Sequence, residues 1–346
     1  MSSRMRKAAP NPVRSLSRRQ FLKASGMTAL LAHLPSGWVG RVFANDAPET
    51  PQIRIGIIAL TDCSSIVIAY EKGFFKQHGL DVTVSKEASW AVIRDKLQLG
   101  ENHATHMLYG MPYASTMGLF GAPVKPMIIP WVLNYNGQAI TLSNELKDKG
   151  IRGPADLKKL LDEEKAAGKS PRTFAMTFPP GTHAMWIRYW LGAGGINPDK
   201  DVSLITIPPP QMVANMTVGK MDGFCKEIIL VRLLGKYDYG DGQGEHEDKD
   251  YMRFYERGVN FPWKSHGVWW LSQFRRWGMV KEAPDYKKIV DQVHRPDIYR
   301  EVAKEMGIAA PTEDLKPEKL FDGVSFDPTK PEEYAKAFAV KNLVEV

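Results

Sequence analysis

Residues 177–225 decide the fold, and they read TFPPGTHAMWIRYWLGAGGINPDKDVSLITIPPPQMVANMTVGKMDGFC. A Pro-Pro-Gly turn precedes an apolar and aromatic run at helical spacing, which ends at Gly194-Gly195. Residues 201–207 then predict a strand, 211–218 a short helix and 222–225 the start of another strand. Helices and strands that alternate in this way are typical of an α/β domain with parallel strands.

The first helix of this stretch begins at a candidate seat for a small anion. Thr182 is predicted to cap the helix, and His183 beside it adds a side-chain donor. The start of a helix carries unpaired N–H groups and the positive end of the helix dipole, which together favour an anion. The alternative is an ordinary capped helix with an exposed histidine.

The N-terminal segment, residues 1–44, predicts an export signal. It holds eight basic residues and no acidic residue. Residues 17–23, SRRQFLK, form a twin-arginine motif, and a weakly apolar run at 24–34 and a small-residue cleavage site at 42–44 follow it. This order is that of a twin-arginine signal peptide. A basic arm that binds nucleic acid would leave the apolar run and the cleavage site unexplained.

Removal of this signal changes what the charge implies. The full chain has 46 Lys and Arg against 39 Asp and Glu, so 38 basic residues remain after cleavage and the net charge is −1. No nucleic-acid or membrane-surface role follows from that balance. The apolar runs after residue 44 fall short of the roughly 20 residues of a membrane helix. We therefore expect a soluble periplasmic protein.

The same segment-by-segment reading predicts the rest of the exported chain. Residues 151–168 read as an amphipathic helix, and 237–248 as a polar loop. The aromatic residues of 254–277 indicate a packing surface. Further strands are predicted at 53–60, 80–84, 126–133 and 172–177, and further helices at 64–72, 89–99, from about 111, 286–293 and 297–306.

Motifs for catalysis, cofactors and metals are absent from the sequence. There is no GxSxG, P-loop, GxGxxG, HExxH or CxxC. His246 lies among acidic residues, but contiguous polar residues in a loop are usually solvated. Cys63 and Cys225 could pair in an oxidising compartment, although buried thiols are the more common state. Cys63 with His183 is the one nucleophile–base pair available, and no sequence motif supports it. We therefore expect no enzyme, no cofactor and no metal site.

Helix starts and a loop amide indicate where a ligand would bind. In parallel sheets the ligand lies beyond the carboxyl ends of the strands, where helices begin. The candidate helix starts are 61–64, 88–90, 109–112 and 181–183, and Gln138 follows a predicted strand. Each has an alternative role that is purely structural, such as a helix cap for Ser89 or a core position for Trp90.

Long, ordered motifs give the chain a family resemblance. The N-terminal ones are LTDCSSIVIAYEKGFF (60–75), EASWAVIRDKLQLG (87–100), MPYAS (111–115), NYNGQAI (134–140) and much of 179–225. Others are YDYGDG (237–242), PWKSHGVWWL (262–271), RWG (276–278) and LFDGVSFDP (320–328). With them the sequence resembles the periplasmic nitrate- and bicarbonate-binding proteins of ABC importers.

The resemblance implies an α/β, two-lobed type II periplasmic binding fold without catalysis. Residues 50–140 would form the first part of lobe 1, and 141–235 a shortened lobe 2. Residues 236–346 would pack back on lobe 1. In nitrate binders of this family a tryptophan, a glutamine and a histidine line the anion site. They correspond here to Trp90, Gln138 and His183, with Thr182 beside the last.

The sequence departs from the family after Cys225. The family continues with a lysine-bearing segment that neutralises nitrate, and bicarbonate binders carry an acidic residue there. Here Cys225 runs through KEIIL almost directly into KYD at 236–238, so that block is missing. Lys264 belongs to a later motif, and the lysine's role is not transferred to it.

These observations predict a solute-binding protein that delivers nitrate, or a related small oxyanion, to an ABC permease after export by the Tat machinery. The alternatives are a repurposed family member that acts as a ligand sensor or structural partner, a bicarbonate or sulfonate binder, and an enzyme on the same fold.

Overall fold

The structure, a computed structural model, describes residues 48–227, 236–238, 244–247 and 251–343. By its internal contacts the chain divides into two units, 1–49 and 50–346. The described residues belong almost entirely to the second unit, and the predicted signal peptide, 1–44, lies outside them. None of the helices among the described residues is long and apolar enough to cross a membrane.

The first sheet has three parallel strands in the order β2-β1-β3. The strands are β1 (Gln52–Ile57), β2 (Asp81–Lys86) and β3 (Ala104–Thr105). The helices that connect them are η2 (Thr61–Cys63), α2 (Ser64–Glu71), α3 (Phe74–Gln77) and α4 (Trp90–Leu99). The sequence predictions for β1, α2, β2 and α4 are confirmed. These segments have local signals, such as β-branched runs and a helix-ending glycine.

Ser89 caps α4 as predicted, because its Oγ accepts a hydrogen bond from the Val92 backbone N–H at 3.3 Å. We expect Ser89→Ala to lower the free energy of unfolding by about 1 kcal/mol. Urea denaturation of both proteins measures this loss. Ser170, an exposed serine, supplies the control variant S170A, and a loss as large in S170A would contradict the capping role.

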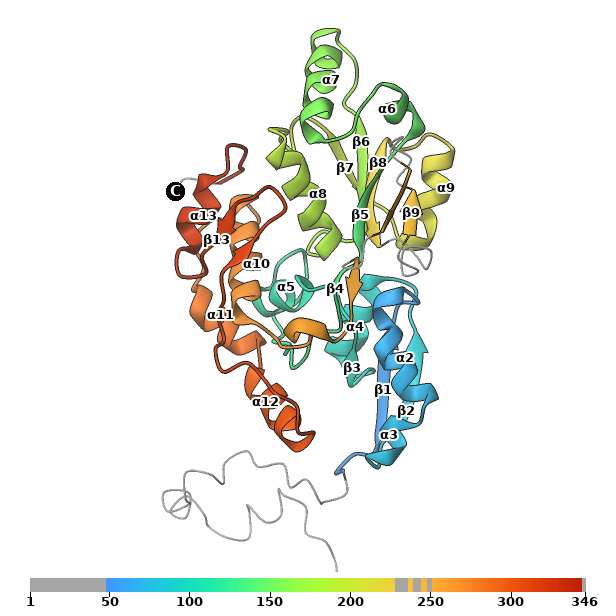
Figure 1. Cartoon of the computed structure of the whole chain (residues 1–346), viewed down its shortest axis with the longest axis vertical. Helices are drawn as coiled ribbons and strands as arrows, with labels where there is room; N and C mark the ends of the chain where they lie inside the picture. Colours follow the sequence, from blue (N-terminus) through green and yellow to red (C-terminus); the bar gives the residue numbers. More distant parts are fainter. Residues whose placement is uncertain (1–47, 228–235, 239–243, 248–250, 344–346) are drawn as a thin grey trace, which may run out of the picture. The chain divides into compact units, whose positions relative to one another are not determined.

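The second sheet has four strands in the order β5-β8-β6-β7, and it lies apart from the first sheet (Figure 1). The strands are β5 (Gln138–Leu142), β6 (Thr173–Met176), β7 (Ser203–Thr206) and β8 (Gly223–Glu227). Strand β6 is parallel to β7 and β8, whereas β5 pairs antiparallel with β8. The sequence predicted crossover helices and parallel strands, and β5 departs from that pattern. The helices here are α6 (Asn144–Asp148), α7 (Pro154–Ala166), α8 (Thr182–Ala193), η3 (Pro209–Gln211) and α9 (Met212–Thr217).

The remaining elements are short strands and a set of C-terminal helices. Helix α5 (Met111–Met117) is confirmed, as are α11 (Tyr286–Val293) and α12 (Pro296–Glu305). The other helices are η5 (Glu256–Gly258), α10 (Lys264–Arg276) and α13 (Pro331–Ala337). The strand pairs are β4 (Tyr135–Asn136) with β11 (Met252–Arg253), β9 (Lys236–Asp238) with β10 (Glu245–Glu247), and β12 (Glu318–Lys319) with β13 (Ser325–Phe326).

Two element predictions were wrong. Residues 126–133 were predicted as a strand, but they form only one isolated bridge, from Ile129 to His294. Pro126 and Pro130 remove backbone donors from this segment, which therefore cannot form a regular ladder. Residues 237–248 were predicted as a loop, yet strands β9 and β10 pair antiparallel there; residues 239–243 and 248 lie outside the described residues. That pairing joins polar residues, which carry no apolar alternation to reveal it.

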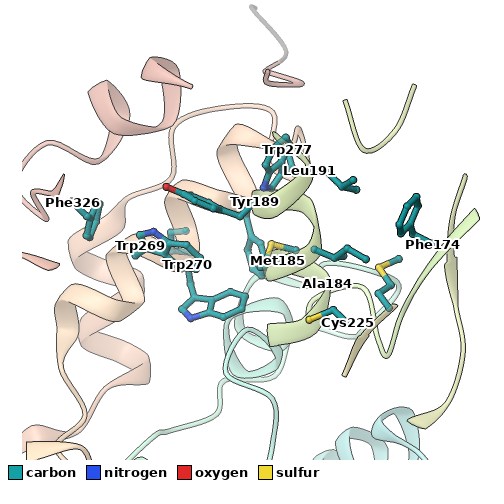
Figure 2. Packing of buried hydrophobic residues seen from close by; sticks show 14 of the residues in the cluster. Phe174, Ala184, Met185, Tyr189, Leu191, Cys225, Trp269, Trp270, Trp277 and Phe326 are labelled. Carbon is teal, nitrogen blue, oxygen red and sulfur yellow. The ribbon is translucent and has the colours of Figure 1, made fainter. Parts of the chain in front are cut away.

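Helix α8 lies at the centre of the main hydrophobic core. Its side chains lie between the sheet residues Phe174 and Cys225 on one side and the α10 tryptophans Trp269 and Trp270 on the other (Figure 2). The ring of Trp186 packs on that of Trp269, with centroids 5.3 Å apart. The prediction of a packing surface in the aromatic block is confirmed. This packing holds the start of α8, and hence Thr182 and His183, in place.

Candidate functional site

A cavity of about 1430 Å³ lies beyond the strand ends of both sheets. Asp62 and His106 line it from the segments that follow β1 and β3, and Thr182 and His183 line it from the segment that follows β6. Gln138, the first residue of the antiparallel strand β5, joins them. Ligands of α/β proteins bind in such a position. The two sheets therefore contribute polar groups to one cavity.

The structure corrects the predicted role of Thr182. Gly181 is the N-cap of α8, and Thr182 is the first helical residue and makes no capping bond. Its Oγ1 instead accepts a hydrogen bond from the Tyr109 backbone N–H at 3.3 Å. The preceding turn places Gly181, not Thr182, at the cap position, so the Thr182 hydroxyl makes this long-range hydrogen bond instead of a capping bond. Thr182 thus ties α8 to the segment before α5.

His183 is buried, with 2 % of its surface exposed, so the alternative of an exposed histidine was wrong. Its Nδ1 lies 3.0 Å from Thr177 Oγ1. Burial lowers the pKa of His183 to about 4, while the charge of Asp62 opposes this shift and that of Lys226 adds to it. His183 is therefore a neutral hydrogen-bonding group at neutral pH.

The structure brings Gln138, Thr182 and His183 to the cavity but not Trp90. Among the described residues, Gln138 Oε1 is buried without a hydrogen-bond partner. Trp90 is 2 % exposed and packs with Ile58, Ile93, Leu108 and Met111, behind the cavity lining. Its Nε1 also has no partner among the described residues.

Sequence reasoning missed His106 and did not single out Asp62 within its helix start. His106 is 2 % exposed, and its Nε2 lies 3.3 Å from Asp62 Oδ1. The angle is not that of a hydrogen bond, so among the described residues both ring nitrogens and Asp62 Oδ1 lack a partner. The rings of Trp90 and His106 pack in a T-shaped arrangement, with centroids 5.0 Å apart. Strand β3, which places His106, has two residues and leaves no readable pattern in the sequence.

A second group of polar side chains lines the cavity from the C-terminal segment. His266 Nε2 lies 2.9 Å from Glu318 Oε1, and its Nδ1 lies 3.2 Å from Tyr135 Oη. Lys316 Nζ lies 2.7 Å from the same Glu318 oxygen. Burial lowers the pKa of His266, although Glu318 opposes that shift. The Lys316 charge is therefore balanced by Glu318 and is not available to neutralise an anion.

Lys264 makes two ion pairs, with Asp291 and Asp314, each at 2.9 Å. It is not among the residues that line the cavity. Lys264 therefore does not take the place of the family lysine in this cavity.

The cavity shows no arrangement for metal or thiol chemistry. Within 48–227 and the later described segments, no group of three or more His, Cys, Asp or Glu side chains could hold a metal ion. Cys63 and Cys225 are both buried thiols, as the sequence favoured. Burial raises the pKa of Cys225, so this thiol stays protonated and is a poor nucleophile.

Gly110 determines how closely the segments before α5 and α8 approach each other. A Cβ at this position would collide with the Pro180 carbonyl oxygen and lie 3.0 Å from two atoms of the Trp270 ring. We expect Gly110→Ala to lower the free energy of unfolding by about 1–3 kcal/mol and to weaken ligand binding, because it displaces Thr182. Thermal unfolding and calorimetry measure the two effects. Gly153 has open space around it, so the control G153S should show neither effect, and an equal loss in both variants would contradict the prediction.

Comparison with known proteins identifies the family. The NMT1-like family model matches residues 46–227. The nitrate/nitrite binding protein NrtA of Synechococcus elongatus is 34% identical over 442 positions, which cover 94% of this chain and 99% of that protein. The bicarbonate transport ATP-binding protein CmpC of Synechococcus elongatus is 28% identical, over 84% of this chain and 55% of that protein.

A solved structure agrees with the sequence comparison. The crystal structure of the periplasmic nitrate-binding protein NrtA from Synechocystis PCC 6803 matches with a TM-score of 0.80 and 32% identity. The match covers 85% of this chain and 100% of that one. The mixed α/β fold predicted from the sequence, that of periplasmic solute-binding proteins, is thereby confirmed.

The alignment also bears on the predicted missing block. It runs over 442 positions, of which this chain fills about 325, that is, 94% of its 346 residues. More than one hundred positions therefore have no counterpart here. This deficit agrees with a missing block, and its location after Cys225 stays a prediction. The chain belongs to the NMT1-like family, as a relative of the nitrate/nitrite binding protein NrtA.

Proposed function

We propose that this protein is the periplasmic solute-binding component of an ABC importer for nitrate or a related small oxyanion. The observation that carries the proposal is the convergence of Gln138, Thr182 and His183 on one cavity. Membership of the NrtA family supports it. Binding would involve no catalysis, and closure of the lobes around the ligand would provide capture and release to the permease.

The proposed site binds the anion with neutral donors. If the Thr177 hydroxyl donates to His183 Nδ1, the imidazole proton lies on Nε2 and can donate to an oxyanion. The backbone N–H groups of the first turn of α8 and the helix dipole add to the attraction. The Gln138 amide supplies a further donor. Trp90 stays in the proposal as a residue that supports the lining from behind, because its ring packs against the cavity residue His106; its buried indole N–H has no partner among the described residues.

The location and partners belong to the same proposal. The twin-arginine motif of residues 17–23 would direct export by the Tat machinery to the periplasm. There the protein would deliver its ligand to an inner-membrane permease. Support comes from the relatives, one of which is a periplasmic nitrate-binding protein and another a bicarbonate transport ATP-binding protein.

The lack of counterparts for more than one hundred positions of the NrtA alignment favours a second candidate function. A family member that lacks more than one hundred positions, with the predicted loss of the neutralising lysine, could serve as a ligand sensor or a structural partner. Calorimetry of the exported form with nitrate, nitrite, bicarbonate and an alkanesulfonate separates the two. We expect binding heat with nitrate. The absence of heat with all four anions would reject the importer function and favour this alternative.

A further inference from the structure

Helix α8 has one partly exposed face, which runs from the proposed anion seat along the cavity. Thr182, Trp186 and Trp190 are partly exposed, whereas eight other residues of the helix are buried. All three line the cavity. Residues four apart lie on the same face of a helix, with a rise of about 6 Å from one to the next. A strip of indole surface therefore continues from the anion seat at the helix start.

Aromatic residues of the C-terminal segment lie against the first of these tryptophans. The centroid of the Trp186 ring lies 5.3 Å from that of Trp269 and 6.2 Å from that of Phe321. Phe321 also lines the cavity, and it is 59 % exposed. Aromatic side chains stabilise a fold mainly through burial, so large rings left partly exposed at a cavity are typical of a surface that a ligand covers. We call Trp186, Trp190 and Phe321 the aromatic strip.

The cavity is larger than a nitrate ion requires, and its lining carries more positive than negative charge. Its volume of about 1430 Å³ exceeds the roughly 300–1,000 Å³ of pockets for organic ligands, whereas nitrate has only four heavy atoms. Among the described residues, five basic and two acidic side chains line it, namely Lys125, Arg253, Arg257, Lys316 and Lys319, with Asp62 and Glu318. A cavity with such a lining attracts anions. Size and charge together therefore favour an organic anion.

A carboxylate group can take the place of nitrate at the start of α8. Both groups are planar, with oxygens around one central atom, and both carry one negative charge. In an aromatic carboxylate a ring replaces the third oxygen. The donors proposed for nitrate, among them His183 and the backbone N–H groups of the first turn, can bind the carboxylate oxygens. Side chains of a helix lean toward its N-terminus, which directs Trp186 toward a ring attached to that carboxylate.

We propose that the site binds an aromatic carboxylate, with the carboxylate at the start of α8 and the ring on the aromatic strip. This inference rests on the proposed function, because it uses the same anion seat. The ring gains apolar burial and aromatic contacts with Trp186 and Phe321, which nitrate cannot make. Trp190, one turn further along α8, lengthens the strip for a ligand with a second ring. Binding forms no covalent bond and needs no proton transfer, because a carboxyl group is ionised at neutral pH.

Calorimetry of the exported form at neutral pH with the sodium salts of nitrate, acetate, benzoate and cyclohexanecarboxylate tests the proposal. Acetate has the same charged group without a ring, and cyclohexanecarboxylate has a saturated ring of the same size. We expect benzoate to bind about 10- to 100-fold more tightly than acetate, because it buries a ring. We expect it to bind about 2- to 10-fold more tightly than cyclohexanecarboxylate, because only benzoate makes aromatic contacts. Nitrate should displace benzoate, because the two share one seat.

Variants of the strip and of the seat separate ring binding from anion binding. W186L keeps an apolar side chain but removes the indole, so it should reduce the preference for benzoate over acetate by about 3- to 10-fold and leave nitrate binding nearly unchanged. H183A should weaken nitrate and benzoate alike. Tyr255 is 77 % exposed and is not among the residues that line the cavity, so the control Y255A should change neither affinity. Melting curves show whether each variant is folded.

The results that would overturn the inference can be told apart. Benzoate that binds no more tightly than acetate, while nitrate binds, rejects the inference and leaves the proposed function intact. Equal affinities for benzoate and cyclohexanecarboxylate reject the aromatic class of ligand, and benzoate that nitrate does not displace rejects the shared seat. A folded W186L that loses nitrate and benzoate affinity equally rejects the ring contact with Trp186. The absence of heat with nitrate, nitrite, bicarbonate and benzoate rejects the proposed function and this inference with it. The wild-type comparison does not depend on whether a variant folds.

Discussion

Replacement of His183 with alanine is expected to weaken nitrate binding by about 10- to 100-fold, because one hydrogen bond to a charged ligand contributes about 1.5–3 kcal/mol. His183 lines the cavity at the start of α8 and is neutral and buried. Its loss removes a donor that no water molecule can replace at low cost. Titration calorimetry of the exported form measures the affinity.

Two further variants make the His183 test specific. H183Q keeps an amide donor near the position of Nε2 and should retain more of the affinity than H183A. T177V keeps the imidazole but removes the hydroxyl 3.0 Å from Nδ1, so it should cause a smaller loss than H183A. Melting curves of each variant show whether it is folded. An unchanged affinity in a folded H183A would exclude the start of α8 as the anion site.

Replacement of Arg276 with alanine is expected to lower the free energy of unfolding by about 3–5 kcal/mol, because it leaves a large buried site unfilled and its hydrogen-bond acceptors unpaired. Arg276 is fully buried in α10. Its guanidinium donates to the backbone carbonyls of Tyr334 at 2.5 Å and Ala335 at 3.3 Å. The Tyr334 and Phe338 rings lie 4.4 and 4.2 Å from its central carbon.

The Arg276 test has two comparison variants. R276K keeps the charge but loses the planar donor group, so its stability should fall between that of the wild type and R276A. R276M keeps most of the volume and separates the loss of packing from the loss of hydrogen bonds. Urea denaturation monitored by tryptophan fluorescence measures the stability. A loss within about 0.5 kcal/mol in R276A, the range of an ordinary surface substitution, would show that α13 is held on α10 by other contacts.

The elements predicted well from the sequence are those with local signals. Helix α4 begins after the predicted cap Ser89 and ends at Leu99, and α11 spans the predicted residues 286–293. A cap, an apolar stripe and a glycine each act within one or two turns. The antiparallel pairing of β5 with β8 could not be read in this way, because it joins residues about 85 positions apart, such as Ile140 and Cys225.

The candidate site was predicted in part for the same reason. Gln138, Thr182 and His183 were named from their positions at element ends, and the cavity contains all three. His106 was missed because its importance comes from Asp62, a residue in another segment, and from burial that no neighbouring residue reveals. Thr182 was named correctly for the cavity but with the wrong role, because its partner, Tyr109, lies far away in the chain.

The sequence by itself determined the family, the α/β fold and the helix start that carries His183, because motifs, periodicity and capping chemistry are local properties of the chain. Only the tertiary structure decided that His183 is buried and neutral, that Trp90 lies behind the cavity lining, and that His106 faces Asp62. Burial and electrostatic interactions depend on groups from distant segments. For this protein the order of residues therefore indicates where an anion would bind, and the packed fold determines which charges it would meet.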